Sequence, residues 1–389
     1  MEDKKRLKIG LFIDNFFPNI DGVVLVVDNL AKELSKYNDV VVVAPYSESY
    51  EDDISRGYKV VRVGSYSVPF SEYRLGKVQT KLSSKYRHLL EENFDIIHIH
   101  SPFIIGKLGL SIAKELSIPC ICTVHTRFDY EIRRVVDSNI VVNRIMKNII
   151  NVFNKCDKCI VVNDPMIKEI KKFGYKNKPI VIYNGTDLKK LDNNDKYIKK
   201  INKMYKLKDE TILLFVGRII EIKNIFFILD SLKLLKEDNF KFKMLFVGTG
   251  PDENKFKEKI REYGMEDDII MTGKITDRNM LSSIYERADL LLFPSLFDTS
   301  SLVRIEAAVN ETPGLFIKGS MVGETILDNI DGFVTELDVV TYKNRIKEIF
   351  DNRKLLDRVS INARVMLGKS WNEIAKETYE LYIKEIARK

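Results

Sequence analysis

Residues 211–224 read TILLFVGRIIEIKN, and this stretch decides how the chain folds. The six residues Thr211–Val216 are almost continuously apolar, which predicts a strand that is buried on both of its faces. Gly217 ends the strand, and a helix opens after Asn224. A buried strand that turns through a short loop into a helix is the repeating unit of a doubly wound parallel sheet.

The same unit repeats on both sides of this stretch. The other apolar runs of strand length are Lys8–Ile13, Val40–Ala44, Lys59–Val63, Asp95–His100, Pro119–His125, Cys159–Val162, Ile180–Tyr183, Lys243–Val247, Ile269–Thr272, Asp289–Phe293 and Gly314–Ile317. Helical patterns lie between them, for example Leu25–Lys36, Leu82–Glu92 and Gly106–Leu116. Two such series predict an α/β protein with two doubly wound, Rossmann-like domains and a central cleft.

A polar segment separates the two series. Asn184–Asp187 (NGTD) predicts a turn, and Lys189–Lys200 is rich in Lys, Asn and Asp, which predicts an exposed linker. Trp371–Lys389 has a helical pattern, and its periodicity leaves open which domain it packs on. We place the first domain at residues 1–188 and the second at residues 189–371.

The composition excludes several other classes of protein. Of 389 residues, 45% are hydrophobic and 31% are charged, as in an ordinary globular chain. No uncharged apolar run approaches the roughly 18 residues of a spanning helix, and Met1–Arg6 lacks the apolar region of a signal peptide. Four cysteines are too few for a disulfide scaffold, so we expect a cytoplasmic protein.

The charge balance is mildly basic. Lys and Arg number 63 and Asp and Glu 56, so the net charge is +7. Such an excess permits attraction to phosphates or to an anionic membrane without requiring either. No aromatic-plus-basic recognition motif appears, and we expect no nucleic-acid partner.

Residues that directly follow a strand are the candidates for ligand binding, because open parallel sheets bind ligands beyond the carboxyl ends of their strands. Arg218 and Lys223 flank the turn after Thr211–Val216 and can direct two cations at one diphosphate. Gly248–Pro251 (GTGP) follows another strand, but Glu253 stands where G-x-G-x-x-G has its third glycine. The fingerprint of a dinucleotide-binding protein is therefore not met.

Residues 293–307 (FPSLFDTSSLVRIEA) carry the densest chemical signal. Asp298 precedes a helix that we expect to begin near Ser301, and Glu306 lies within that helix. The amides of Ser301, Leu302 and Val303 at the helix N-terminus suit a phosphate. Carboxylates beside a phosphate site can accept hydrogen bonds from the hydroxyl groups of a sugar. The alternative is structural, with Asp298 as a helix cap and Glu306 as an ion-pair partner.

In the first domain, three of the four histidines lie at strand ends. We expect His125 to contact a ligand, and His98 and His100 to be core residues or to support the site. Gly22 opens the helix after the first strand, where it lets a ligand approach the backbone closely. A plain helix-entry turn is the equal alternative for Gly22.

Metal sites find little support in the sequence. Cys120-x-Cys122 and Cys156-x-x-Cys159 can form a four-thiolate zinc site only if their strands adjoin, and their spacing favours small core residues. No Asp-x-Asp occurs in the chain, so a metal-bound diphosphate is not expected.

Taken in order, these motifs resemble the retaining glycosyltransferases of the GT-B fold, family 4. The matching segments are the loop to Gly22, IHIHSP (97–102), VHT (124–126), YNGTD (183–187), GR-x4-K (217–223), GTGP (248–251) and the acidic pair. Two positions depart from the family pattern. Asp298 replaces the first Glu of E-x7-E, and Ser301 stands where glycine is common.

The resemblance implies a role for each matching residue. Glu306 holds the ribose hydroxyls of a sugar nucleotide, and Asp298 binds hydroxyls of the donor sugar. Arg218 and Lys223 stabilise the departing diphosphate. His125 contacts the donor sugar at its reacting face. The developing charge on the diphosphate is then the main target of stabilisation.

The remaining roles are also carried over from the resemblance. Further donor contacts come from Gly22, Gly248 and the amides of Ser301, Leu302 and Val303, and acceptor contacts come from Asp14, Asp129 and Tyr130. The family retains the anomeric configuration and needs no cofactor or metal. Its last helix returns to the first domain, which assigns residues 372–389 there.

Within the family, Asp298-Thr299 and residues 125–130 (HTRFDY) look most like bacterial synthases that glucosylate diacylglycerol. We expect a UDP-hexose donor, UDP-glucose above all, and a lipid or cell-surface glycan acceptor. Arg74–Arg87 and Arg133–Lys158 interleave cations with apolar residues, which is typical of helices on the inner face of an anionic membrane. An ordinary amphipathic surface helix is the equal alternative.

Two other classes of function stay open at this point. A sugar-nucleotide epimerase or phosphorylase can share the two-domain architecture. An epimerase turns over without an acceptor, and a phosphorylase normally carries a pyridoxal-phosphate lysine with its own absorbance. A non-catalytic nucleotide-sugar-binding module binds UDP-sugars without turnover.

Overall fold

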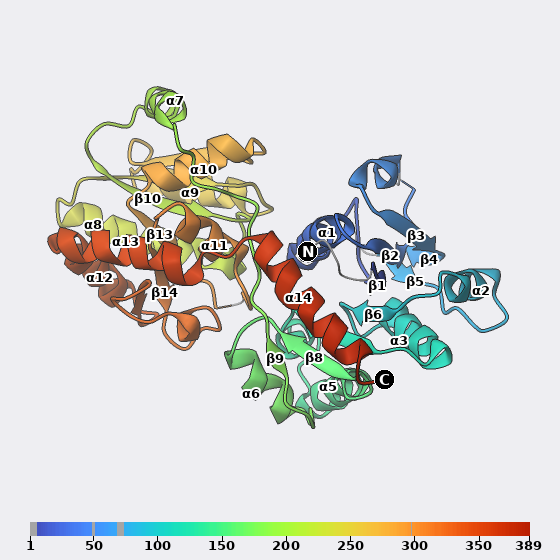
Figure 1. Cartoon of the computed structure of the whole chain (residues 1–389). Coiled ribbons are helices and arrows are strands. Elements are labelled where there is room, and N and C mark those ends of the chain that lie inside the picture. Colours follow the sequence, from blue (N-terminus) through green and yellow to red (C-terminus); the bar gives the residue numbers. More distant parts are fainter. Residues whose placement is uncertain (1–5, 49–50, 68–73, 297) are drawn as a thin grey trace. The chain divides into compact units, whose positions relative to one another are not determined.

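The protein is described from a computed structural model that covers residues 6–48, 51–67, 74–296 and 298–389 (Figure 1). Residues 1–5, on which the expected absence of a signal peptide partly rests, lie outside the described residues. The chain divides into two compact units, Met1–Asn184 with Trp371–Lys389 and Gly185–Ser370. The boundaries predicted from the sequence lie after residues 188 and 371.

The first unit is built on a parallel sheet whose described strands lie in the order β3-β2-β1-β6-β7-β8-β9. The order runs outward in both directions from β1, so the sheet is doubly wound as predicted. The strands are β1 Lys8–Phe12, β2 Asp39–Pro45, β3 Lys59–Val63, β6 Ile96–Ile99, β7 Cys120–Val124, β8 Lys158–Val161 and β9 Ile180–Val181. A separate antiparallel pair consists of β4 Ser65–Ser67 and β5 Arg74–Gly76.

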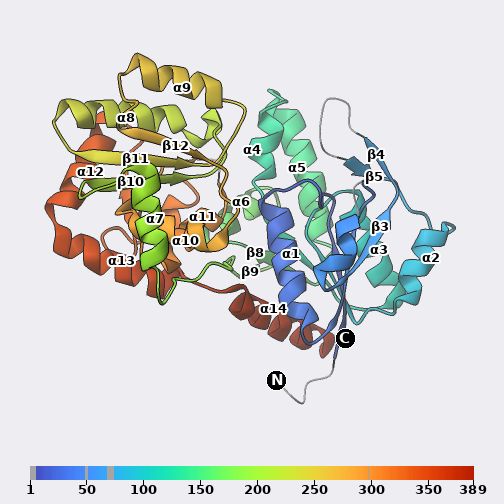
Figure 2. The same cartoon turned by 90° about the horizontal axis from the view of Figure 1, so that it is seen from above.

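Helices cover both faces of this sheet. The helices are α1 Gly22–Ser35, α2 Ser84–Glu91, α3 Ile104–Leu116, α4 Phe128–Arg133, α5 Asn139–Phe153, α6 Pro165–Lys172 and α14 Trp371–Ile386, with a 3-10 turn η1 at Glu51–Arg56. Side chains of α2, α3, α5 and α6 share one buried cluster with the strands. The C-terminal helix α14 packs beside α1, and both views show the two helices side by side (Figures 1 and 2).

The second unit repeats the plan with a parallel sheet, in which the described strands lie in the order β12-β11-β10-β13-β14-β15. The strands are β10 Thr211–Val216, β11 Phe242–Val247, β12 Ile269–Gly273, β13 Leu290–Phe293, β14 Gly314–Ile317 and β15 Phe333–Thr335. The helices are α7 Asp195–Tyr205, α8 Ile225–Glu237, α9 Glu253–Glu262, α10 Arg278–Arg287, α11 Leu302–Val309, α12 Val339–Asp351 and α13 Arg353–Leu367, with 3-10 turns η2 Glu221–Lys223 and η3 Gly323–Thr325.

Two buried clusters line the two faces of the second sheet. Side chains of α8, α9, α12 and α13 contribute to one of them, and side chains of α7, α10 and α11 contribute to the other. Figure 2 shows α8 and α9 on one side of the sheet and α7 and α10 on the other. Every residue of Thr211–Val216 is buried, because helices cover both sides of this central strand. This is the physical reason for the continuous apolar run in the sequence.

The linker prediction is wrong in part. Residues 195–205 form α7, which packs on α10 through the fully buried Ile201. The helix is otherwise rich in Lys, Asn and Asp, so its polar composition concealed a narrow apolar stripe.

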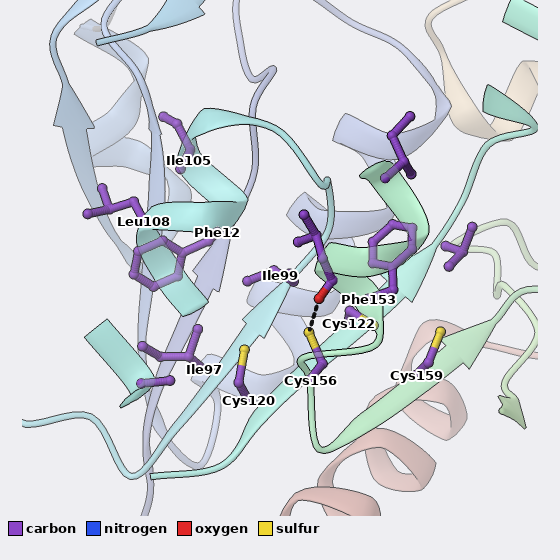
Figure 3. Packing of buried hydrophobic residues seen from close by; sticks show 14 of the residues in the cluster. Phe12, Ile97, Ile99, Ile105, Leu108, Cys120, Cys122, Phe153, Cys156 and Cys159 are labelled. Carbon is purple, nitrogen blue, oxygen red and sulfur yellow. Dashed lines mark hydrogen bonds between the residues drawn. The ribbon is translucent and has the colours of Figure 1, made fainter. Parts of the chain in front are cut away.

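The four cysteines lie in the core of the first unit (Figure 3). Cys122 and Cys159 are paired in register on β7 and β8, and the Cys156 thiol contacts the Val152 carbonyl at 3.6 Å. Within the described part of the chain, no group of three or more His, Cys, Asp or Glu side chains has a geometry that can hold a metal ion. All four cysteines are buried members of this hydrophobic cluster.

Candidate active site

The loops after β10 and β11 meet at the carboxyl edge of the second sheet. The Gly217 amide donates to the Val247 carbonyl at 3.0 Å, and the Ile219 amide donates to Thr249 at 3.1 Å. Gly248 has φ +139°, and a Cβ atom there would lie 1.9 Å from the Gly217 carbonyl oxygen. Only glycine fits such an approach of two backbones. The predicted donor residue Gly248 thus has a structural task as well, which is to join the two loops.

Lys223 and Asp298 are brought together at this edge. Lys223 ends η2, Asp298 lies in the loop after β13, and Nζ of Lys223 is 2.5 Å and 2.6 Å from the two carboxylate oxygens. The side chains are 18% and 20% exposed. Asn224 fixes the same loop, since its side-chain amide donates to the Pro294 carbonyl at 2.8 Å. A cation and a carboxylate therefore lie side by side, within reach of a ligand at the surface.

Arg218 does not join this pair. Its side chain is exposed, and no ion pair or side-chain hydrogen bond holds the guanidinium among residues 6–48, 51–67, 74–296 and 298–389. The prediction that Arg218 acts together with Lys223 on one anion remains a prediction.

The N-terminus of α11 lies directly after the Asp298 loop. Ser301 is the N-cap residue, and its hydroxyl accepts a hydrogen bond from the Arg304 amide at 3.3 Å. Helix α11 begins at Leu302, one residue after the predicted start. The amides of Leu302 and Val303 have no acceptor within the helix, because they belong to its first turn. They are the amides of this terminus that can face an anion.

Glu306 lies one turn into α11, with a side chain that is 13% exposed. Its two carboxylate oxygens accept hydrogen bonds from the Tyr285 hydroxyl at 2.9 Å and from the Arg278 guanidinium at 3.2 Å. Arg278 is also paired with both carboxylate oxygens of Asp187. Burial raises the pKa of Glu306, and the Arg278 charge only partly opposes this shift.

Sequence reasoning missed Arg278 and Tyr285. Both lie on α10, at least 21 residues before Glu306, and neither directly follows a strand. A buried tyrosine on an amphipathic helix looks like any core residue, so the sequence contains no local signal for it. Asp187 belongs to the YNGTD segment, which was interpreted as a turn, and its side chain restrains Arg278.

The three strand-end histidines of the first unit form one cluster. Nδ1 of His98 shares a hydrogen bond with the Tyr382 hydroxyl, and Nε2 shares one with the Thr123 hydroxyl, both at 2.6 Å. Nδ1 of His100 lies 2.9 Å from Nε2 of His125. Burial lowers the pKa of His98 and of His125 to about 3 and the pKa of His100 well below its usual value. All three rings are therefore neutral at pH 7.

The remaining predicted residues of the first unit have structural partners. The Asp14 carboxylate is partly buried and accepts from the Ser101 hydroxyl at 2.6 Å and from the Ile105 amide at 2.7 Å, so it caps α3. Asp129 is buried and paired with Arg127 at 2.8 Å.

Tyr130 and Gly22 face more open surroundings. Tyr130 is partly buried, and the Arg127 guanidinium carbon lies 6.0 Å from the centre of its ring. Gly22 begins α1 behind the N-cap Asp21, and a Cβ atom there would meet nothing within 4 Å. The backbone at Gly22 is thus accessible, although the space around it does not require a glycine.

Two doubly wound units, with a cation, two carboxylates and a helix N-terminus at one sheet edge, are the arrangement that the resemblance to GT-B glycosyltransferases implies. Residues 20–190 match the family described as Glycosyltransferase Family 4, and residues 197–366 match the family described as Glycosyl transferases group 1. The chain belongs to these glycosyltransferases and is a hexosyltransferase.

Its relatives include two proteins named alpha-monoglucosyldiacylglycerol synthase. The one from Streptococcus pneumoniae is 26% identical over 84% of this chain and 74% of its own length. The one from Acholeplasma laidlawii is 24% identical over 96% and 94%. A GDP-mannose-dependent alpha-mannosyltransferase from Corynebacterium glutamicum is also 24% identical, over 100% and 91%.

The fold matches solved structures over nearly the whole chain. HepE from Anabaena in complex with UDP gives a TM-score of 0.77 at 15% identity, over 97% of this chain and 100% of that one. Sucrose-phosphate synthase from Thermosynechococcus elongatus gives 0.73 at 19% identity, over 99% and 100%. These likenesses confirm the predicted GT-B architecture.

Proposed function

We propose that this glycosyltransferase moves glucose or a related hexose from a UDP-sugar to a hydroxyl group of a lipid, with diacylglycerol as the leading acceptor. Two relatives named for monoglucosyldiacylglycerol support this acceptor. The likeness of residues 125–130 to such synthases points the same way. A cell-surface glycan is the second acceptor to test.

The arrangement around α11 is the observation that carries the proposal. Lys223, the amides of Leu302 and Val303, and the two carboxylates lie at one sheet edge of the second unit. The cation and the amides suit a diphosphate. Glu306 is placed to accept hydrogen bonds from the two ribose hydroxyls. Asp298 is placed to accept hydrogen bonds from hydroxyls of the donor sugar.

The main requirement of sugar transfer is stabilisation of the departing diphosphate. The bond between the anomeric carbon and the diphosphate oxygen breaks, and the acceptor oxygen forms the new bond on the same face of the sugar. The acceptor proton passes to the departing diphosphate. Lys223 and the α11 amides oppose the negative charge that develops there, which is how preorganised donors lower a barrier.

The reaction is expected to proceed without a metal ion. The chain has no Asp-x-Asp, and Lys223 stands where the diphosphate is proposed to bind. We predict that dialysis against EDTA leaves kcat within about twofold of the untreated enzyme. Steady-state transfer with and without added Mg²⁺ or Mn²⁺ tests this, and a strict need for either ion would contradict the metal-free mechanism.

The surface of α5 and the segment before it supports a lipid acceptor. Ile140 is 81% exposed and Val135 84% exposed, and the exposed cations Arg144 and Lys147 lie on the same helix as Ile140. Exposed apolar side chains among cations are typical of helices that lie on anionic membranes. Among the described residues, no helix has the length and apolar character needed to cross a bilayer. We therefore propose attachment to the inner face of the cell membrane from the cytoplasm.

Replacing Ile140 by Glu is expected to weaken binding to vesicles at least fivefold. The change removes apolar area and adds a charge that an anionic surface repels. Co-sedimentation with vesicles that contain phosphatidylglycerol measures the effect. Val365→Glu is the matched control, because Val365 is 77% exposed on α13 in the other unit. Equal loss of vesicle binding in both variants, or no loss in either, would contradict the proposal that α5 binds the membrane.

A transfer assay tests the proposed function directly. The protein is incubated with UDP-glucose and vesicles that contain diacylglycerol, and the lipid product is analysed by NMR. We expect an α-linked glucosyl lipid and release of UDP. Turnover without an acceptor would favour an epimerase, and binding of UDP-sugars without any product would favour a binding module. Transfer only from GDP-mannose would make the chain a mannosyltransferase.

A further inference from the structure

The histidine cluster of the first unit contains one buried polar atom without a hydrogen-bond partner among the described residues. His100 is 3% exposed, and its Nδ1 shares a hydrogen bond of 2.9 Å with Nε2 of His125. The other ring nitrogen, His100 Nε2, is buried and has no hydrogen-bond partner in the part of the chain that the structure describes. The protons of the two rings must be arranged around this one hydrogen bond.

Two arrangements are compatible with it. In the first, His100 carries its proton on Nδ1 and donates to His125, which leaves a bare lone pair on His100 Nε2. In the second, His125 donates from Nε2, and the proton of His100 is buried on Nε2 without an acceptor. Orphaned buried N–H groups are rarer in proteins than under-satisfied acceptors. The first arrangement is therefore favoured.

His98 holds the ring of His100 in place. Their centroids are 4.1 Å apart, and both nitrogens of His98 are anchored by hydroxyl groups, Tyr382 on α14 and Thr123 on β7. The His100 and His125 rings lie edge to edge and nearly in one plane, with centroids 5.2 Å apart and planes 21° apart, as their hydrogen bond requires. These contacts fix the orientation of the three rings, and burial keeps them neutral.

We propose that His100 is a positioning residue that fixes His125 in the tautomer with its proton on Nδ1. His125 is only partly buried, and across the described ranges no hydrogen-bond partner faces its Nδ1. This nitrogen then presents an N–H donor to a ligand oxygen. If the proposed function holds, that oxygen belongs to the donor sugar. His125 acts there as a hydrogen-bond donor and not as a base, because its lone pair on Nε2 already accepts from His100.

The tautomer can be observed without any ligand. The chain has only four histidines, so a ¹⁵N-histidine sample gives four ring patterns in a long-range ¹H–¹⁵N correlation spectrum. Single substitutions assign them. We expect His125 to show a protonated Nδ1 and an unprotonated Nε2 at pH 7. A proton on Nε2 of His125 would overturn the proposal.

Two substitutions of His100 separate positioning from packing. The amide of Asn occupies the place of Nδ1 and can still donate to His125, whereas Leu cannot. We expect His100→Leu to lose the Nδ1–H pattern of His125 and to lower kcat about tenfold, and His100→Asn to restore both. An unchanged His125 pattern in His100→Leu would contradict the positioning role. If the wild-type protein gives the expected spectra but transfers no sugar, the proposed function is wrong and the positioning role of His100 stands.

Discussion

Replacing Lys223 by Ala is expected to lower kcat for sugar transfer about 100- to 1,000-fold, the usual effect of removing one preorganised charge from a developing anion. Lys223 is held at 2.5 Å from Asp298, so the cation is already in position before the reaction begins. Its charge matters most as the diphosphate departs, and KM is expected to change less than kcat. Initial rates over a range of donor concentrations separate the two parameters.

The control for Lys223 lies nearby. Lys255 is 64% exposed and paired only loosely with Glu221 at 3.4 Å, so Lys255→Ala is expected to leave kcat unchanged. Asp298 loses its ion-pair partner in Lys223→Ala, and the double variant with Asp298→Asn shows how much of the loss comes from that carboxylate. A kcat within threefold of wild type in Lys223→Ala would remove Lys223 from the proposed site.

Replacing Glu306 by Gln is expected to weaken UDP binding about 100-fold without weakening the fold. Two hydrogen bonds from ribose hydroxyls to a charged group contribute about 1.5–3 kcal/mol each, and an amide oxygen replaces only part of this. Isothermal titration with UDP measures the loss. A Kd within threefold of wild type would contradict the ribose-binding role.

The expected stability follows from the sign of the pKa shift. Burial raises the pKa of Glu306 above its usual 4.5, so the folded chain binds this proton more tightly than the unfolded chain. The resulting stability is present below pH 4.5 and is lost as pH rises through the folded pKa. At pH 7 the buried charge is therefore a cost that Gln removes. The unfolding temperature of Glu306→Gln is expected to equal or exceed that of wild type, and a fall of several degrees would show that the charge supports the fold.

Most of the fold could be predicted because helices cover both faces of each sheet. Continuous apolar runs such as Thr211–Val216 and Gly314–Ile317 coincide with β10 and β14. The edge strand β15 and the short hairpin of β4 and β5 were not predicted, since strands of three residues are too short to form a recognisable pattern. Helix α7 was hidden by its many polar residues, because Ile201 is the only residue that it buries among those described.

The candidate site was predictable only where function follows a strand end. Lys223 and Asp298 come from separate loops after β10 and β13, and the rule that ligands bind at carboxyl ends predicts that such loops approach one another. Arg278 and Tyr285 lie on a helix, and only tertiary packing brings them to Glu306. The capping role of Asp14 was also hidden, because α3 begins 90 residues later in the chain.

We propose that the second unit binds a uridine-diphosphate sugar through the residues around α11. Thermal unfolding with UDP, UDP-glucose, GDP, GDP-mannose, ATP and NAD tests it most directly. A ligand at 100 times its Kd adds about 2.7 kcal/mol of stability. We expect UDP and UDP-glucose alone to stabilise the wild type, and both to stabilise Glu306→Gln only slightly. Stabilisation by ATP or NAD with none from any sugar nucleotide would contradict it.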